Sequence, residues 1–210
     1  ISSITPTNDA PVITRPATVT TVEDTDYTFS AAAITLADVD AGNGLVKLTL
    51  SIPSGSIKLA TGSSIFTDAT GSTPLGTPVF AGSLTVYGTL ANLNAALNGL
   101  VYRPAANENA VTQSVANRTL TITVDDMGYG LAGFASGTRQ TDTKTILIGI
   151  TPVNDQPVIV GPSAASAYQE QAAAVTIGAG VSVSDLIDDT QMSGATVVIS
   201  NNYVAGDVLA

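Results

Sequence analysis

TLTITV, at residues 119–124, decides the class of fold. Threonine alternates with apolar residues, so Leu120, Ile122 and Val124 fall on one face of an extended chain and the threonines on the other. This two-residue period predicts a β-strand with one buried face. We expect further short strands, each bounded by Gly, Pro, Asn or Ser, at residues 45–52, 145–150 and 195–200. Many short strands between turn residues are typical of an all-β sandwich.

One segment departs from this pattern. TLANLNAALN, at residues 89–98, places three leucines at the spacing of a helical face: Leu90, Leu93 and Leu97. Thr89 can cap the start of a helix and Gly99 can end it. The sequence therefore predicts one short helix near residues 89–98, covering the core at one end of the sandwich.

The composition excludes several classes of function. The 210 residues carry 7 basic and 17 acidic side chains and a net charge of -10. We expect no nucleic-acid partner and no membrane insertion, because such a chain repels phosphates and anionic lipid and has no apolar run of spanning length. Cys and His are absent from the sequence, which removes thiolate zinc sites and histidine catalysis. Asp125 and Asp126 are adjacent and point to opposite faces of an extended chain, so they form no catalytic pair. We expect no enzymatic activity.

A sequence repeat divides the chain into modules. ITPTNDAPVI at residues 4–13 returns as ITPVNDQPVI at residues 150–159, with eight of ten positions identical. We expect three parts: the end of a preceding module or a linker, a complete module, and the N-terminal part of a second, truncated module, at residues 1–7, 8–152 and 153–210. A half-module exposes unpaired strand edges, which further chain or a neighbouring molecule would complete.

Acidic residues gather at the expected strand ends and linkers. The clusters are Asn8-Asp9, echoed by Asn154-Asp155, then Glu23-Asp24, Asp38-x-Asp40 and Asp125-Asp126. In extended chain Asp38 and Asp40 point the same way and can face one cation, and the glycines that follow allow a tight turn. Carboxylate, amide and carbonyl oxygens are the ligands that Ca²⁺ prefers. Each cluster alone is typical of a turn, and their joint occurrence favours calcium.

Three stretches carry a family resemblance. ADVDAGNGLVKLTLSIPSG, at residues 37–55, resembles the cadherin pattern in which a DxD turn opens into a strand. TLTITVDDMG and KTILIGITPVNDQPVI, at residues 119–128 and 144–159, are similar to the C-terminal half of a cadherin module with its Asn-Asp linker. GTLANLNAALNGLVYRPAANE, at residues 88–108, resembles the insertion in bacterial cadherin-like repeats of large surface adhesins.

The resemblance implies tandem Greek-key β-sandwich modules of cadherin-like, immunoglobulin-like type, with Ca²⁺ at their junctions. Matching positions imply an upstream junction site with five ligands: Asn8, Asp9, Asp38, Asp40 and Asp126. They imply a downstream site with four ligands: Glu23, Asn154, Asp155 and Asp185. The linker lacks the leading acidic residue of cadherins and no counterpart of their mid-domain acidic motif stands out, which implies fewer ions per junction. Asp188 and Asp189 are alternative downstream ligands.

Two functions remain open on these grounds. The first is a calcium-stiffened spacer or adhesion repeat of a secreted bacterial cell-surface protein, whose partners are neighbouring modules and a surface receptor or glycan. The alternative is a self-assembling filament or surface-layer subunit, a homopolymer in which a neighbouring chain completes the open half-module. A carbohydrate-binding module is disfavoured because Trp is absent and the aromatic share is 5%. We expect Tyr27, Tyr87 and Tyr102 in the core.

Overall fold

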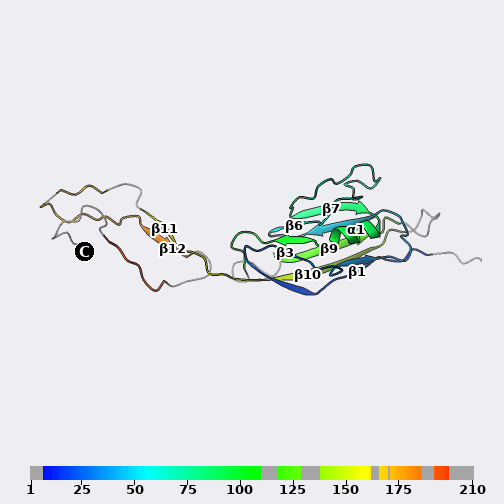
Figure 1. The fold of residues 1–210 in the computed structure, drawn as a ribbon, viewed down its shortest axis with the longest axis horizontal. Coiled ribbons are helices and arrows are strands. Elements are labelled where there is room, and N and C mark those ends of the chain that lie inside the picture. The colour runs from blue at the N-terminus through cyan, green and yellow to red at the C-terminus, as the bar shows by residue number, and fades with distance from the viewer. Residues whose placement is uncertain are drawn as a thin grey trace, which may run out of the picture. The chain divides into compact units, whose positions relative to one another are not determined.

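The chain divides into two compact units, Ile1–Pro152 and Val153–Ala210, and each is described by itself. The boundary falls at the residue where the sequence repeat places the start of the second module. Residues 1–6, Asp188 and Asp189 lie outside the described part of the chain. The computed structural model (Figure 1) describes residues 7–109, 118–128, 138–161, 166–169, 171–185 and 192–198.

The first unit is built on a five-stranded sheet. In spatial order its strands are β2 (Thr18–Val22), β10 (Thr141–Thr151), β9 (Thr119–Asp125), β5 (Val46–Ser51) and β7 (Ser83–Gly88). β10 runs parallel to β2, and all other neighbours are antiparallel. The strands predicted at residues 45–52, 119–124 and 145–150 are confirmed.

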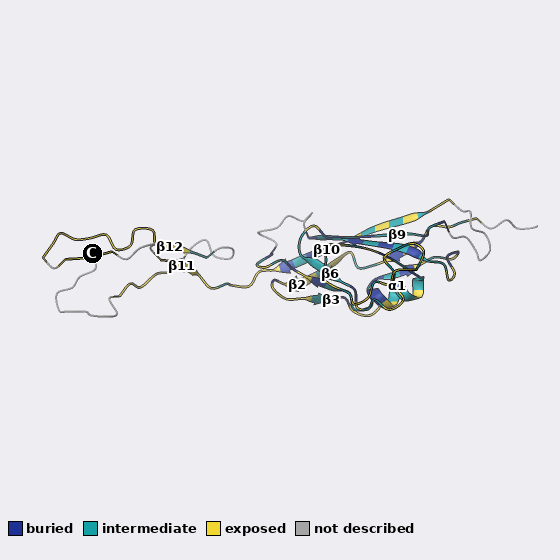
Figure 2. Cartoon of the chain, turned by 90° about the horizontal axis from the view of Figure 1, so that it is seen from above, coloured by how far each residue is buried: buried dark blue, intermediate teal, exposed yellow. Residues whose placement is uncertain are grey.

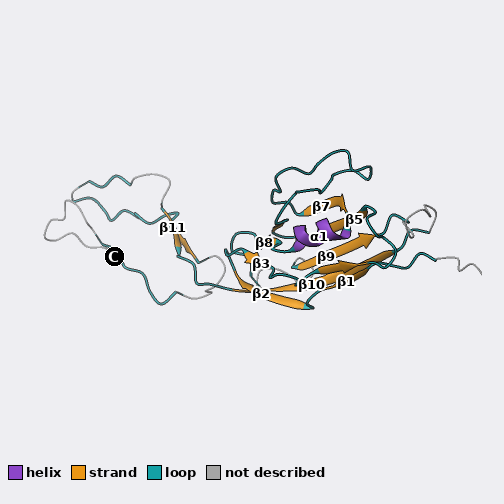
Figure 3. Ribbon diagram, turned by 45° about the vertical axis from the view of Figure 1, so that its right-hand side comes forward, coloured by secondary structure: helices purple, strands orange, loops and turns teal. Residues whose placement is uncertain are grey.

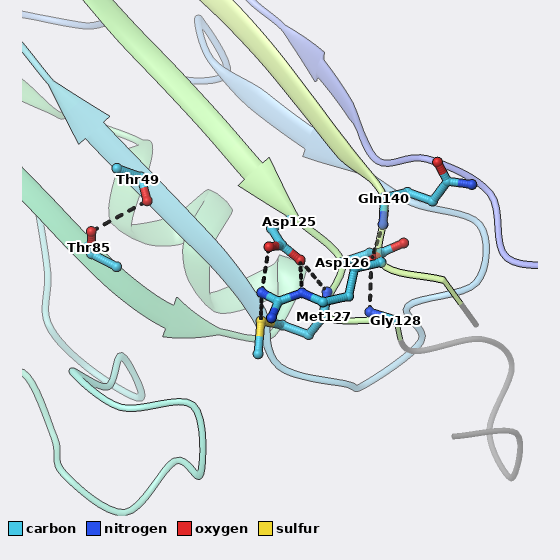
Figure 4. Close-up of polar contacts among 8 residues, drawn as sticks. Thr49, Thr85, Asp125, Asp126, Met127, Gly128 and Gln140 are labelled. Carbon is cyan, nitrogen blue, oxygen red and sulfur yellow. Dashed lines mark hydrogen bonds and ion pairs between the residues drawn. The ribbon is translucent and has the colours of Figure 1, made fainter. Parts of the chain in front are cut away.

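Buried and half-exposed residues alternate along β5 and β9, as the sequence predicts. One face of the sheet is therefore buried. The outer face carries cross-strand threonine pairs. The Thr49 and Thr85 hydroxyls lie 3.4 Å apart (Figure 4), and those of Thr123 and Thr143 lie 3.0 Å apart. Such β-branched pairs stabilise a solvated sheet surface.

Two smaller antiparallel sheets and the helix face the buried side of this sheet. β1 (Val12–Thr14) pairs with β4 (Thr35–Ala37), and β8 (Val101–Arg103) lies between β3 (Tyr27–Thr28) and β6 (Ser56–Lys58). Their inward residues join those of the large sheet in one apolar core (Figure 2). Tyr102 is fully buried there and Tyr27 packs against the core, as expected. Tyr87, also expected in the core, is half-exposed on the outer face beside Lys47.

The single helix of the described residues, α1 (Leu90–Leu97), confirms the predicted one (Figure 3). The Thr89 hydroxyl accepts a hydrogen bond from the backbone N–H of Asn92 at 3.3 Å, and Gly99 follows the helix with φ of 94°. Leu93 and Leu97 are buried in the core. The helix is far too short to cross a membrane, and the described residues hold no helix that could. The fold is therefore mostly β with one short helix.

The second unit contains a two-stranded antiparallel sheet, β11 (Val158–Val160) with β12 (Ser182–Ser184). None of its described apolar residues is buried, and all of β11 is exposed. The strand predicted at residues 195–200 is wrong for residues 195–198, which form no strand. Val197 and Val198 are 74% and 69% exposed, so no packed surface holds this segment in a sheet.

Candidate cation site

The five residues predicted for the upstream junction come from three segments at one end of the first unit. Asn8 and Asp9 precede β1, Asp38 and Asp40 follow β4, and Asp126 follows β9. β1 and β4 are antiparallel with Val12 opposite Ala37, so the start of one strand adjoins the end of the other. The Ile13 N–H donates to the Asp142 carboxylate at 2.9 Å, which ties β1 to the start of β10.

Asp126 is the most deeply buried of the five, with no exposed surface. Its Oδ1 accepts the backbone N–H groups of Gly128 and Gln140 at 2.8 and 2.9 Å (Figure 4). Its Oδ2 accepts a hydrogen bond from the side-chain amide of Asn8, which also donates to the Thr138 carbonyl at 3.0 Å. The linker residue Asn8 is thus held directly by the predicted ligand Asp126.

Asp38 and Asp40 are held together in a different way from the one expected. The chain is not extended here: Asp38 Oδ1 accepts the N–H groups of Asp40 and Ala41 at 2.8 and 2.9 Å, forming a turn that Gly42 continues with φ of 50°. Asp40 is 7% exposed, and its Oδ2 accepts the N–H of Asp9 at 2.6 Å. The linker is therefore tied to this turn as well as to Asp126.

Two oxygen atoms of this cluster are shielded from solvent and accept no hydrogen bond: Asn8 Oδ1 and Asp38 Oδ2. Buried acceptors without a donor cost free energy, and a cation is one partner that would satisfy them. Among the described residues no three acidic side chains are grouped so that they could hold a metal ion. A cation at this cluster would therefore need amide and carbonyl oxygens in addition to carboxylates, a mixture that Ca²⁺ accepts.

The predicted downstream residues are divided between the two units. Glu23 belongs to the first unit and is 2% exposed; its N–H donates to the Thr151 carbonyl at 3.0 Å. In the second unit the Asn154 side chain donates to the Asp155 carbonyl at 2.9 Å, and Asp185 follows β12. Since the units are described separately, the downstream ligand set stays a prediction.

Two polar residues near these positions were missed by the sequence analysis. Glu108 is 2% exposed; its Oε2 accepts the Tyr102 hydroxyl at 3.2 Å and the Ala105 N–H at 2.8 Å, while its Oε1 is shielded and accepts no hydrogen bond. Burial, and then the negative charge of Glu108, raise the pKa of Tyr102 well above 10.0. Gln140 binds Asp126 through its N–H, and its side chain donates to the Asn8 carbonyl at 3.4 Å. In the sequence, Glu108 lies between Asn107 and Asn109, and this polar run could have indicated Glu108 as a candidate residue.

No protein-family model, curated protein or solved structure matches this chain.

Proposed function

We propose that this chain is an extracellular calcium-binding repeat, which acts as a calcium-stiffened spacer or adhesion element of a bacterial surface protein. In this proposal its units are cadherin-like β-sandwich modules of Greek-key, immunoglobulin-like type. The ligand is Ca²⁺, and the binding residues are Asn8, Asp9, Asp38, Asp40 and Asp126. Neighbouring modules of the same polypeptide are the immediate partners, and a surface receptor or glycan is the adhesion target.

One observation carries the proposal. The linker residues Asn8 and Asp9 are hydrogen-bonded to the acidic residues that follow β9 and β4, and two shielded oxygen atoms of this cluster accept no hydrogen bond. Asn8 binds Asp126, and the Asp9 N–H binds Asp40. Asp40 and Asp126 bind adjacent linker residues and each bring a negative charge to this cluster, which positive charge would compensate. Ca²⁺ would supply that charge and would occupy the free positions on Asn8 Oδ1 and Asp38 Oδ2.

The mechanical consequence follows from the position of Asn8 and Asp9. These residues lie shortly before β1, so a cation that binds them would fix the direction in which the chain enters the module. A linker without such a contact would bend freely, and a chain of modules would lose its stiffness. Calcium sites of extracellular modules have dissociation constants of about 10⁻⁴ to 10⁻³ M, and we expect a dissociation constant in this range for the present site.

The two strand pairs at the repeat support a modular arrangement. Val12, Ile13 and Thr14 of β1 pair with Ala37, Leu36 and Thr35. Val158, Ile159 and Val160, the matching residues of the second copy, pair with Ser184, Val183 and Ser182 in the same antiparallel order. The repeated sequence thus forms the same local structure in both units.

Thermal unfolding of the whole chain, with Ca²⁺ and with excess chelator, tests the proposal. At calcium tenfold above the dissociation constant, binding stabilises the folded state by about 1.4 kcal/mol, which raises Tm by about 4 °C. We expect Asp126→Asn, and Asp38→Ala combined with Asp40→Ala, to abolish this rise. Asp68→Asn, which alters a half-exposed acidic loop residue outside the cluster, should retain it. Equal Tm values with calcium and chelator would refute the calcium site.

The filament or surface-layer subunit remains a second candidate because of one observation. In β11 and β12, Ile159 and Val183 are 70% and 43% exposed, whereas the matching residues of the first unit, Ile13 and Leu36, are each 4% exposed. A neighbouring chain could cover this apolar pair. Analytical ultracentrifugation over a hundredfold range of concentration separates the two functions, because a spacer stays monomeric while a filament subunit associates.

A further inference from the structure

The turn after β9 and the residues before β10 are joined by two separate sets of contacts (Figure 4). Asp125 accepts Nε and Nη2 of Arg139 at 3.0 and 2.5 Å and the N–H of Met127 at 2.8 Å. Asp126 accepts the N–H groups of Gly128 and Gln140. The two adjacent carboxylates therefore face opposite ways, and both fix the same two chain segments.

The Asp125–Arg139 contact is a two-point ion pair that restrains orientation as well as distance. Arg139 Nη2 also lies 3.0 Å from the Met127 sulfur, which places the guanidinium across the turn. The Asp126 N–H donates to the Gln140 carbonyl at 3.1 Å, so the residue beside Arg139 is bonded to Asp126 in both directions. A shift of Arg139 would move Gln140 and with it the amide that orients Asp126.

The positive charge of Arg139 and the hydrogen bonds of Arg139 have opposite effects on cation binding. The Asp125 carboxylate is compensated by the guanidinium of Arg139 and accepts the N–H of Met127. Gln140, the neighbour of Arg139, binds the Asp126 carboxylate through its N–H, so the positive charge of Arg139 lies near this ligand. A cation at Asp126 would be repelled by Arg139. The charge of Arg139 thus opposes cation binding, while its contacts order the ligand.

We infer that Arg139 is a positioning residue of the cation site, which raises calcium affinity by holding Asp126 through Asp125 and Gln140. This inference rests on the proposed calcium function. Partners of metal ligands commonly change metal affinity by roughly 10- to 100-fold. The half-exposed position of Arg139 favours the lower end, because solvent weakens such a restraint.

Calorimetric titration of the whole chain with CaCl₂ at ~0.15 M salt tests the sign of the effect. We expect Arg139→Ala to raise the calcium Kd roughly tenfold. A residue that acted only through its charge would give the opposite result, because removing a nearby positive charge strengthens cation binding. Arg139→Lys keeps the positive charge but loses the two-point contact with Asp125, so it should give an intermediate Kd.

The chain offers a matched control in Arg103. Its side chain is 52% exposed, as is that of Arg139, and it forms a two-point ion pair with Asp26. Arg103→Ala changes the net charge by the same amount at a different carboxylate, so its calcium Kd should stay within about twofold of the unmodified chain. Unfolding in chelator shows whether each variant folds, and the chemical shifts of the Gly128 and Gln140 amides show whether the hydrogen bonds to Asp126 have changed.

The outcomes separate this inference from the proposed function. If the unmodified chain binds calcium and Arg139→Ala binds as tightly as Arg103→Ala or more tightly, the positioning role is refuted and the calcium site stands. If the unmodified chain shows no calcium binding, both are refuted. A weakened Arg139→Ala, partial recovery in Arg139→Lys and an unchanged Arg103→Ala would support both.

Discussion

The side chain of Asn94 on helix α1 makes both hydrogen bonds that a neighbouring strand would make to Leu36. Its Oδ1 accepts the Leu36 N–H at 2.8 Å, and its Nδ2 donates to the Leu36 carbonyl at 2.9 Å. Leu36 is 4% exposed, and β4 pairs with β1 along its other edge. One helical side chain therefore closes the free edge of the strand that leads into Asp38 and Asp40.

Asn94→Ala is expected to destabilise the first unit by about 2–6 kcal/mol, because it leaves a buried N–H and a buried carbonyl without partners at about 1–3 kcal/mol each. Urea unfolding measures the loss as a lower midpoint with an unchanged slope. Asn92→Ala is the control on the same helix, since the Asn92 side chain makes one exposed hydrogen bond of 3.4 Å to Ser64. Equal midpoints for the two variants would contradict the role assigned to Asn94.

Tyr102 predicts a loss of stability at alkaline pH. Its pKa in the folded chain is raised above the ordinary value of 10.0, by burial first and then by Glu108. The unfolded chain therefore loses this proton first, so the contribution is complete below about pH 10 and declines as the pH rises further. Tyr102→Phe should cost about 1 kcal/mol at neutral pH and should reduce this alkaline decline. Unfolding free energies across the alkaline range measure both effects.

The matching substitution for that experiment is Tyr168→Phe, because Tyr168 is 62% exposed. We expect it to leave the alkaline decline unchanged. An identical pH dependence for Tyr102→Phe and the unmodified chain would show that the buried hydroxyl has no part in the decline.

Local pattern was sufficient for the elements with a packed face. TLTITV predicted β9 because its period matches a surface buried on one side, and the leucine spacing predicted α1. Residues 195–200 have equally strong β-propensity, but Val197 and Val198 lack a surface to pack against. Tyr87 was misplaced because its face depends on strand register, which sets it opposite Lys47.

Part of the candidate site could be proposed from the sequence, because its acidic residues stand at the ends of predicted strands and in the linker. Asn8, Asp9 and Asp126 were found through acidic strand ends and a family resemblance, and hydrogen bonds join them to one cluster. The geometry of Asp38 was not predicted. Its carboxylate accepts backbone N–H groups in a turn, and the form of that turn depends on the conformation of Gly42 and its neighbours. Gln140 was missed because it reaches the cluster through tertiary pairing and has no local signature.

Asp142 predicts a loss of stability in acid. Burial alone would raise its pKa, but the Lys144 ammonium at 2.7 Å and the Ile13 N–H hold the pKa below its usual 3.8. A carboxyl group with a lowered folded-state pKa contributes stability above its ordinary pKa, and this is lost as the pH falls through the folded value. Asp142→Asn should therefore lower stability by about 1 kcal/mol at pH 7 and reduce the acid-dependent loss below about pH 4.

The control for Asp142 is Asp24→Asn, which removes the same charge at an exposed position and keeps the oxygen that accepts the Asn107 N–H. Unfolding free energies at neutral and acidic pH compare the two variants. If both show the same acid-dependent loss as the unmodified chain, the tie between β1 and β10 does not depend on the charge of Asp142.

Asn8→Asp separates calcium binding from ordinary hydrogen bonding at the linker. Without calcium the variant replaces the amide donor to Asp126 with a second carboxylate, so we expect a loss of about 1–3 kcal/mol in chelator. With calcium the added carboxylate becomes a stronger ligand, so the calcium-induced rise in Tm should exceed that of the unmodified chain. Thr77→Asp, which adds the same charge at an exposed position, should change neither quantity appreciably. A variant that is destabilised equally with calcium and with chelator would mean that Asn8 holds the linker by hydrogen bonds alone.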